Sequence, residues 1–190
     1  MNYFSLFLAA ILINNIVLSK FLGMCPFIGV SKKASSAIGM GLAVTFVILG
    51  ASLFTYLLYH YYLLPLGIAY MDLITFILII ASFVQFTEMV IKKYSPSLYK
   101  SLGIYLPLIT TNCAVLYVAL DNVAKGYNFI EMIVNALGVS LGFTFVLYVF
   151  SAIRERLDSA DVPKYFKGNP ISLIVAAIMA AAFLGFGGIV

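Results

Sequence analysis

Charged residues are scarce in this sequence: they make up 9% of its 190 residues, whereas 64% are hydrophobic and the mean hydropathy is +1.11. Soluble domains carry roughly a quarter charged residues, and a soluble fold of this length cannot hide so much apolar surface. Little of the chain lies outside long apolar stretches, and the longest connection runs from about 154 to 169. The composition therefore excludes a soluble catalytic domain and predicts an integral membrane protein.

Several motifs that carry chemistry are also missing. The sequence has no phosphate-binding glycine loop, no His-containing metal motif, no nucleophile elbow and no CxxC pair. Their absence argues against nucleotide binding by this chain. It also leaves no complete active site on the chain alone.

Six apolar stretches are long enough to cross a hydrocarbon core of about 30 Å, which takes roughly 20 helical residues. They are continuous apolar runs, unlike the alternating segments of a transmembrane barrel. The first has no basic residue before its apolar core and no cleavage site, so we expect a mature helix rather than a signal peptide. The predicted spans are 4–24, 37–60, 71–91, 102–122, 129–152 and 170–190.

The basic residues follow a lopsided pattern. All but one of the 11 Lys and Arg residues lie at the end of the first span or after the first, third or fifth span, and only Lys125 lies on the opposite side. Because Lys and Arg in short loops stay cytoplasmic, we predict both termini outside and three basic loops inside. The net charge of +4 thus reflects topology and contact with anionic lipid, and nucleic acid is not an expected partner. Arg154-Glu-Arg156 is interpreted as part of a mixed-charge inner loop that is solvated or serves for docking.

Two short segments recur about 98 or 99 residues apart. Leu42-Ala-Val-Thr-Phe-Val47 returns as Leu141-Gly-Phe-Thr-Phe-Val146, and Asn14-Asn-Ile-Val-Leu18 resembles Asn112-Cys-Ala-Val-Leu116. Each half holds three spans, an odd number, so the second half must enter the membrane from the opposite face. We therefore predict one all-α membrane domain of about six transmembrane helices, built from inverted repeats at 1–95 and 96–190.

The first span of each half contains the signals of an interrupted helix. Asn14 and Asn15 lie inside an apolar run that Gly23 and Pro26 follow, and Pro107 precedes Thr110-Thr-Asn-Cys113. Inverted repeats tend to place their functional site on such broken helices near the midplane. We expect a broken first helix in each repeat.

Both cysteines of the chain, Cys25 and Cys113, belong to these two spans. A membrane cysteine is often a small packing residue, and a disulfide would need alpha carbons within about 7 Å. Metal ligation is the other interpretation: two thiolates are half of the four ligands that an iron–sulfur cluster normally takes. His60 follows the second span at the outer face, so the other two ligands would have to come from a partner chain.

Other polar residues within the spans have two interpretations. Hydrogen bonding between helices is one, and lining a cofactor pocket, where they would tune a cluster through its sulfur atoms, is the other. Glu88, near one end of the third span, is a candidate for an ion path because acidic residues within membranes are commonly functional. The candidate pocket residues are Asn14, Asn15, Thr110, Thr111 and Asn112.

Long motifs in unbroken order also carry a family resemblance. They are Lys20-Phe-Leu-Gly-Met-Cys-Pro-Phe-Ile-Gly-Val-Ser-Lys-Lys33, Val84-Gln-Phe-Thr-Glu-Met-Val90, Leu106-Pro-Leu-Ile-Thr-Thr-Asn-Cys-Ala114, Ile153-Arg-Glu-Arg-Leu157 and Asp161-Val-Pro163, together with Asn14-Asn15. Over essentially its whole length the chain resembles the membrane proteins that comprise the A subunit of the Rnf ion-translocating ferredoxin:NAD oxidoreductase and the E subunit of the sodium-pumping NADH:quinone reductase. Cys25-Pro26, Gln85-Phe-Thr-Glu88 and Thr110-Thr111 favour the Rnf type.

The resemblance implies a component of a redox-driven translocase in the cell inner membrane, which couples electron transport to movement of Na+ or H+. It implies a homologous partner of opposite orientation, of the Rnf E-subunit type, and an iron–sulfur cluster (2Fe-2S) between the two, held by two cysteines from each. The matching positions here are Cys25 and Cys113. FMN, riboflavin and NAD are implied only on other Rnf subunits. Without the resemblance, a secondary transporter or a structural membrane scaffold would be the alternatives.

Overall fold

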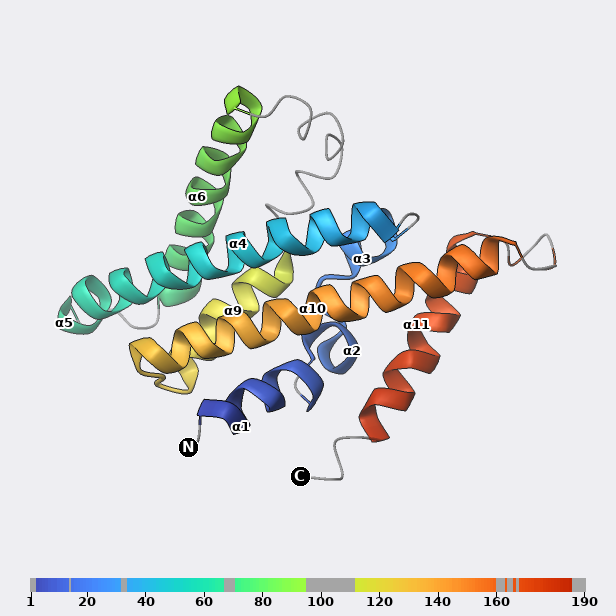
Figure 1. Ribbon diagram of the computed structural model, residues 1–190. Coiled ribbons are helices and arrows are strands. Elements are labelled where there is room, and N and C mark those ends of the chain that lie inside the picture. Colours follow the sequence, from blue (N-terminus) through green and yellow to red (C-terminus); the bar gives the residue numbers. More distant parts are fainter. Residues whose placement is uncertain are drawn as a thin grey trace.

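The computed structural model describes residues 3–13, 15–31, 34–66, 71–94, 112–159, 163, 166 and 168–185, and every regular element among them is helical. Figure 1 shows their arrangement. The elements are α1 (Tyr3–Leu8), η1 (Ala9–Ile13), α2 (Ile16–Lys20), α3 (Met24–Val30), α4 (Ala34–Leu58), η2 (Tyr59–Leu63), α5 (Leu64–Leu66), α6 (Asp72–Tyr94), α9 (Cys113–Ala124), α10 (Phe129–Asp158) and α11 (Asn169–Leu184).

Two long helices, α4 and α10, lie side by side and antiparallel at the centre of the molecule (Figure 1). They approach closely where Gly41 of α4 faces Thr144 of α10, since a Cβ on Gly41 would overlap Thr144 Cγ2. The central apolar residues of both helices, such as Val44 and Leu147, are fully buried. The two helices also contain the segments 42–47 and 141–146, which match between the halves of the sequence. They therefore form the core on which the shorter elements pack.

The chain up to Val30, which contains the predicted first span 4–24, forms four helical pieces, α1, η1, α2 and α3. Its first two pieces pack against α10, where the glycines of Gly138-Val-Ser-Leu-Gly142 leave room for a neighbouring backbone. A Cβ on Gly138 would lie 2.8 Å from Ala10 Cβ, and one on Gly142 would lie 2.9 Å from the Ile11 carbonyl oxygen. Small residues four apart allow this kind of close helix approach inside a membrane.

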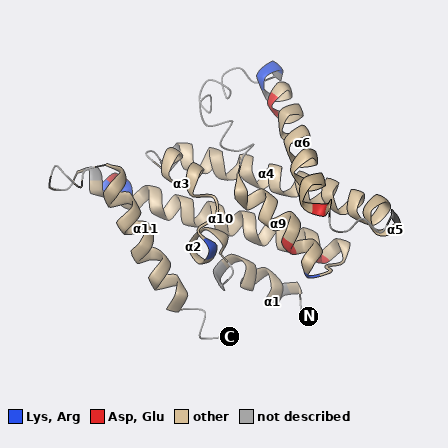
Figure 2. Ribbon diagram, turned by 180° about the vertical axis from the view of Figure 1, so that it is seen from behind, with Lys and Arg blue, Asp and Glu red and all other residues tan. Residues whose placement is uncertain are grey.

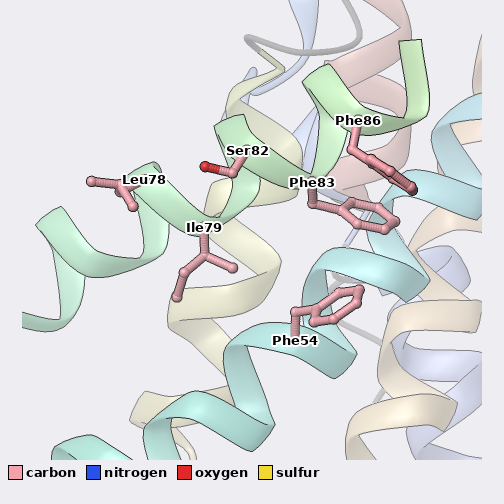
Figure 3. Close-up of a pocket in the computed structure, with 6 residues that line it drawn as sticks. All are labelled: Phe54, Leu78, Ile79, Ser82, Phe83 and Phe86. Atoms are coloured by element: carbon pink, nitrogen blue, oxygen red, sulfur yellow. The ribbon is translucent and has the colours of Figure 1, made fainter. Parts of the chain in front are cut away.

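Helix α6 stands away from the central pair, touching α4 and α9 along one side (Figure 1). Between α4 and α6 lies an open groove of about 350 Å³, lined by Phe54 of α4 and by α6 residues that include Phe83 and Phe86 (Figure 3). Ser82 supplies the only hydroxyl among the lining side chains. The side chains that line the groove therefore form no polar cluster that would support chemistry.

Among the described residues, three helices are long and apolar enough to cross a membrane: Ser36–Leu63, Asp72–Val90 and Phe129–Leu157. They correspond to the predicted spans 37–60, 71–91 and 129–152. The described parts of two further predicted spans are shorter apolar helices, Cys113–Ala124 and Asn169–Leu184. Charged residues gather near helix ends (Figure 2). The fold class predicted from the sequence, an all-α membrane protein, is confirmed.

One interpretation of the charge pattern is wrong. The sequence places Arg154 in a mixed-charge loop, but α10 continues to Asp158 and buries Arg154 to 6% exposure, whereas Glu155 and Arg156 are exposed. The residues after 152 keep good helix propensity despite their charge, so the end of hydrophobicity is not the end of the helix.

Candidate functional site

The break in the first span lies between Ile13, the last residue of η1, and Ile16, the first residue of α2. Asn15 caps α2: its Oδ1 accepts a hydrogen bond of 3.2 Å from the Val17 amide. Its Nδ2 donates to the carbonyl oxygens of Ile11 (3.2 Å) and Gly142 (3.0 Å). Since backbone groups at a helix break have no intrahelical partner, this buried amide satisfies free groups on both sides of it.

A second break separates α2 from α3. Phe21 ends α2 in the left-handed conformation (φ 54°), and Gly23 has φ 82° immediately before α3. A Cβ on Gly23 would lie 2.9 Å from Phe143 Cε2 and 3.3 Å from Asn112 Oδ1. Position 23 therefore needs glycine for its backbone angle and for its close contacts.

The start of α9 repeats the geometry of α2. Asn112 has φ −70° and ψ 111°, and its side chain accepts from the Ala114 amide at 3.1 Å. Asn15 has φ −62° and ψ 111°, with the same bond to the amide two residues on. The matching caps are thus Asn15 and Asn112, one residue away from the sequence match of Asn14 with Asn112.

Cys25 follows the second of these breaks, in α3, and Cys113 lies at the start of α9. Cys113 is the first residue of α9, and its Sγ accepts a hydrogen bond of 3.0 Å from the backbone N–H of Gly23, two residues before Cys25. Both cysteines are free thiols exposed on the surface of the chain. The fold therefore brings the two cysteine segments together, although 90 residues separate Gly23 from Cys113.

Among the described residues, the arrangement offers two sulfur ligands. Within the described parts of the chain, no group of three or more His, Cys, Asp or Glu side chains could surround a metal ion. Two surface thiolates fit half of a four-cysteine iron–sulfur site. The remaining ligands would have to come from outside the described residues, as they would if a second membrane protein covered this surface.

The other predicted site residues divide into three groups. Asn15 and Asn112 are buried, at 2% and 4% exposure, and lie beside the cysteine segments. Asn112 Nδ2 has no hydrogen-bond partner among the described residues. Asn14, Thr110 and Thr111 lie outside the described residues. Glu88 is half-buried on α6, so its ion-path role stays a prediction.

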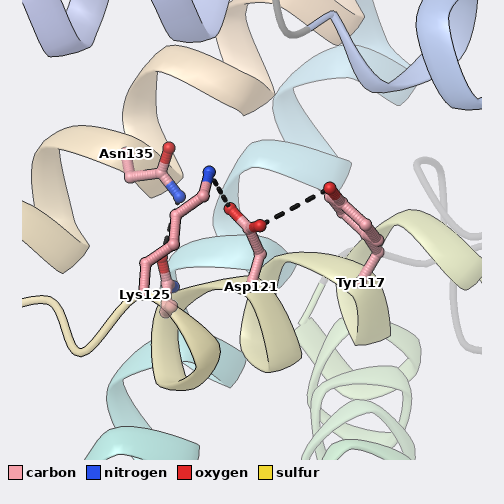
Figure 4. Close-up of polar contacts among 5 residues, drawn as sticks. Tyr117, Asp121, Lys125 and Asn135 are labelled. Carbon is pink, nitrogen blue, oxygen red and sulfur yellow. Dashed lines mark hydrogen bonds and ion pairs between the residues drawn. The ribbon is translucent and has the colours of Figure 1, made fainter.

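A polar network on α9 and α10 is missed by the sequence interpretation (Figure 4). Asp121 accepts from Lys125 Nζ at 2.8 Å and from the Tyr117 hydroxyl at 3.5 Å. Burial of the Lys125 ammonium lowers its pKa, but the hydrogen bond and the negative charge of Asp121 outweigh burial and leave the pKa above its usual value. Beside it, Asn135 Nδ2 donates to Asn122 Oδ1 at 2.8 Å, and both amides are buried.

We expect the Asn122–Asn135 bond to couple α9 to α10. In a double-mutant cycle of Asn122→Ala and Asn135→Ala, thermal unfolding in detergent should give a coupling free energy of about 0.6–2 kcal/mol, as for other hydrogen bonds between membrane helices. Gln85→Ala, which removes an exposed amide on α6, is the control and should change stability by less than about 0.5 kcal/mol. Additive single-variant effects would show that the bond stabilises nothing.

Comparison with known proteins identifies relatives along the full chain. Residues 3–190 match the family described as "Rnf-Nqr subunit, membrane protein". The chain is 58% identical over 189 residues to the A subunit of the ion-translocating oxidoreductase complex of Aliivibrio salmonicida, covering 100% of this chain and 98% of that protein. It is 56% identical over 188 residues to the A subunit of the Na(+)-translocating ferredoxin:NAD(+) oxidoreductase complex of Acetobacterium woodii, covering 99% and 98%.

Proposed function

Since the chain belongs to the Rnf-Nqr family of membrane subunits, we propose that it is the A subunit of an ion-translocating ferredoxin:NAD oxidoreductase complex. Identity of 56–58% to such proteins over nearly the whole of both chains supports this assignment. The chain contributes to an oxidoreductase as one membrane component of a multi-subunit complex. Its task is electron transport within the bilayer, coupled to ion movement.

Cys25 and Cys113 are the residues that would hold an iron–sulfur cluster. The observation that carries this proposal is the hydrogen bond from the Gly23 amide to Cys113 Sγ, which joins the two cysteine segments at an exposed surface. When bound, a 2Fe-2S cluster supplies a site that gains and loses one electron. Backbone N–H groups directed at sulfur stabilise added negative charge and are one of the protein's means of setting a cluster's potential.

A second membrane protein of the complex would supply the other two thiolates. The exposure of both cysteines supports this, because a cluster held by two ligands at an open surface is incomplete. We expect this partner to be a homologous protein of opposite orientation, the Rnf E-subunit type. FMN, riboflavin and NAD sites belong on other subunits, and lipid surrounds the remaining apolar surface.

The inverted repeat of 1–95 and 96–190 is part of the same proposal. The matching caps support it: Asn15 lies at the start of α2, and Asn112 lies at the start of α9. With both termini outside and the basic loops cytoplasmic, the two cysteines would approach one another from oppositely oriented halves. Added charge at Cys25 and Cys113 is costly in a low-dielectric core, so it can bias two arrangements of the halves and drive movement of Na+ or H+.

The test is electron paramagnetic resonance with iron and sulfide analysis on the anaerobically purified complex. We expect Cys25→Ser and Cys113→Ser each to remove the same cluster signal, retain the flavins and abolish ferredoxin-dependent NAD reduction. Met24→Leu, a conservative change beside Cys25, is the matched control and should keep every signal. Survival of all cluster signals in both serine variants would return the cysteines to a packing role and favour the transporter or scaffold interpretations.

A further inference from the structure

Arg154 is a charged side chain buried in the interior of a membrane protein, at 6% exposure. Burying a charge is costly unless its hydrogen-bonding groups are satisfied. On the same helix, Arg156 is exposed and carries the same charge. The burial of Arg154 therefore calls for a specific structural role that Arg156 does not share.

The guanidinium of Arg154 joins three segments of the chain. Its Nη1 donates to the Ile28 carbonyl oxygen at 2.7 Å and to Ser31 Oγ at 2.8 Å, and its Nη2 donates to Asn169 Oδ1 at 3.5 Å. Ile28 belongs to the last turn of α3, where carbonyl groups have no intrahelical partner. A cation at this end of a helix also interacts favourably with the helix dipole. Arg154 thus caps α3 and ties it to α10 and to the start of α11.

A second contact fixes the same short helix. Phe150, one turn before Arg154 on α10, stacks on Phe27 of α3 with ring centroids 4.2 Å apart and an interplanar angle of 25°. Both rings are buried, at 1% or less exposure. Arg154 and Phe150 therefore hold one end and one side of α3, while the Gly23 amide holds the other end against Cys113.

Cys25 lies between these anchors, two residues after Gly23 and three residues before Ile28. Because Gly23 adopts a left-handed conformation that only glycine tolerates well, the chain can turn there if the far end of α3 is released. Such a turn would carry Cys25 away from Cys113. Ligand sets work only when their atoms are held within about 0.5 Å of the required geometry.

We propose that Arg154 is a positioning residue that fixes α3, and through it Cys25, relative to Cys113. The effect on a cluster rests on the proposed function, but the placement of Cys25 by Arg154 concerns this chain alone. Arg154 does not touch the ligands. Its removal should therefore act through the placement of Cys25.

The first measurement concerns the full chain in lipid nanodiscs without metal. Because Cys25 and Cys113 are its only cysteines, nitroxide labels on both report their separation by paramagnetic resonance. We expect one narrow distance distribution in the wild type and in Arg156→Gln, and a broader or shifted one in Arg154→Gln. Ser31→Ala, a milder change that removes one acceptor of the guanidinium, should broaden the distribution less. Wild-type distributions in both Arg154→Gln and Ser31→Ala would overturn the proposal.

The second measurement uses the assembled complex and follows iron release to a chelator. Loss of residues that orient metal ligands typically weakens metal affinity about 10-fold to 100-fold, so Arg154→Gln and Arg154→Lys should release iron faster while Arg156→Gln matches the wild type. Equal release from all variants would overturn the role at the cluster. If the Cys25→Ser complex keeps every cluster signal, the proposed function fails instead, and the label distances still decide whether Arg154 positions Cys25.

Discussion

Gly23→Ala is expected to lower the free energy of unfolding by about 2–5 kcal/mol. The left-handed backbone at φ 82° costs a residue with a Cβ about 1–2 kcal/mol, and overpacking adds about 1–3 kcal/mol. The new methyl group would lie 2.9 Å from Phe143 Cε2. The Phe143 ring is 1% exposed, so it has little room to move aside.

Gly126→Ala separates the two causes. Gly126 also has positive φ, at 61°, but a Cβ there meets no atom within 4 Å. Gly126→Ala should therefore lower the free energy of unfolding only by the backbone cost of about 1–2 kcal/mol. Thermal unfolding in the same detergent gives the comparison. Equal losses for Gly23→Ala and Gly126→Ala would mean that Phe143 and Asn112 do not confine position 23.

Gly23→Ala is also expected to affect the cysteines. Gly23 donates its amide to Cys113 Sγ, so displacement of residue 23 should weaken that hydrogen bond. In the assembled complex, Gly23→Ala should shift the potential of the cluster proposed at Cys113, whereas Gly126→Ala should leave it unchanged. An unshifted signal in folded Gly23→Ala complex would separate the packing role of Gly23 from any role at sulfur.

The sequence predicts the break in the first span because the break is caused by local chemistry, whereas the predicted break in the span 102–122 falls outside the described residues. Asparagine side chains compete for backbone groups and favour caps, so their presence inside an apolar run marks the break before α2 and the start of α9. Sequence and structure differ on the exact cap: the repeat match selects Asn14, whereas the geometry assigns the capping role to Asn15. Adjacent asparagines offer the same chemistry, and only tertiary packing decides between them.

Pro26 and Gly23 have equal weight as helix breakers in the sequence, but they act differently. Pro26 lies in the first turn of α3, where its missing N–H costs nothing because that group has no intrahelical partner. Gly23 makes the turn itself. Proline therefore marks where α3 starts, whereas glycine causes the break.

The tertiary contacts of the site cannot be predicted from local sequence patterns. The hydrogen bond from Gly23 to Cys113 joins residues 90 positions apart, and the sequence suggests the pairing of the cysteines only through their shared position in broken spans. The burial of Arg154 is also missed, since its neighbours Glu155 and Arg156 are charged and exposed. A single inward position in a charged turn carries no periodic signal.

Gly142→Ala is expected to destabilise the protein by about 1–3 kcal/mol through overpacking. Its Cβ would lie 2.9 Å from the Ile11 carbonyl oxygen and 3.2 Å from Asn15 Nδ2. The first neighbour is backbone and the second is an amide held by two hydrogen bonds, so neither yields easily. The added methyl group therefore acts directly on the break between η1 and α2.

Gly39→Ala is the matched control, because Gly39 lies in helix α4 and a Cβ there meets no atom within 4 Å. Alanine has higher helix propensity than glycine by about 0.5–1 kcal/mol, so this variant should be neutral or slightly more stable. The comparison is made by thermal unfolding in detergent. A neutral Gly142→Ala would mean that close packing at Gly142 does not hold the broken first span against α10. In that case the hydrogen bond from Asn15 Nδ2 to the Gly142 carbonyl oxygen would be what keeps the break in place.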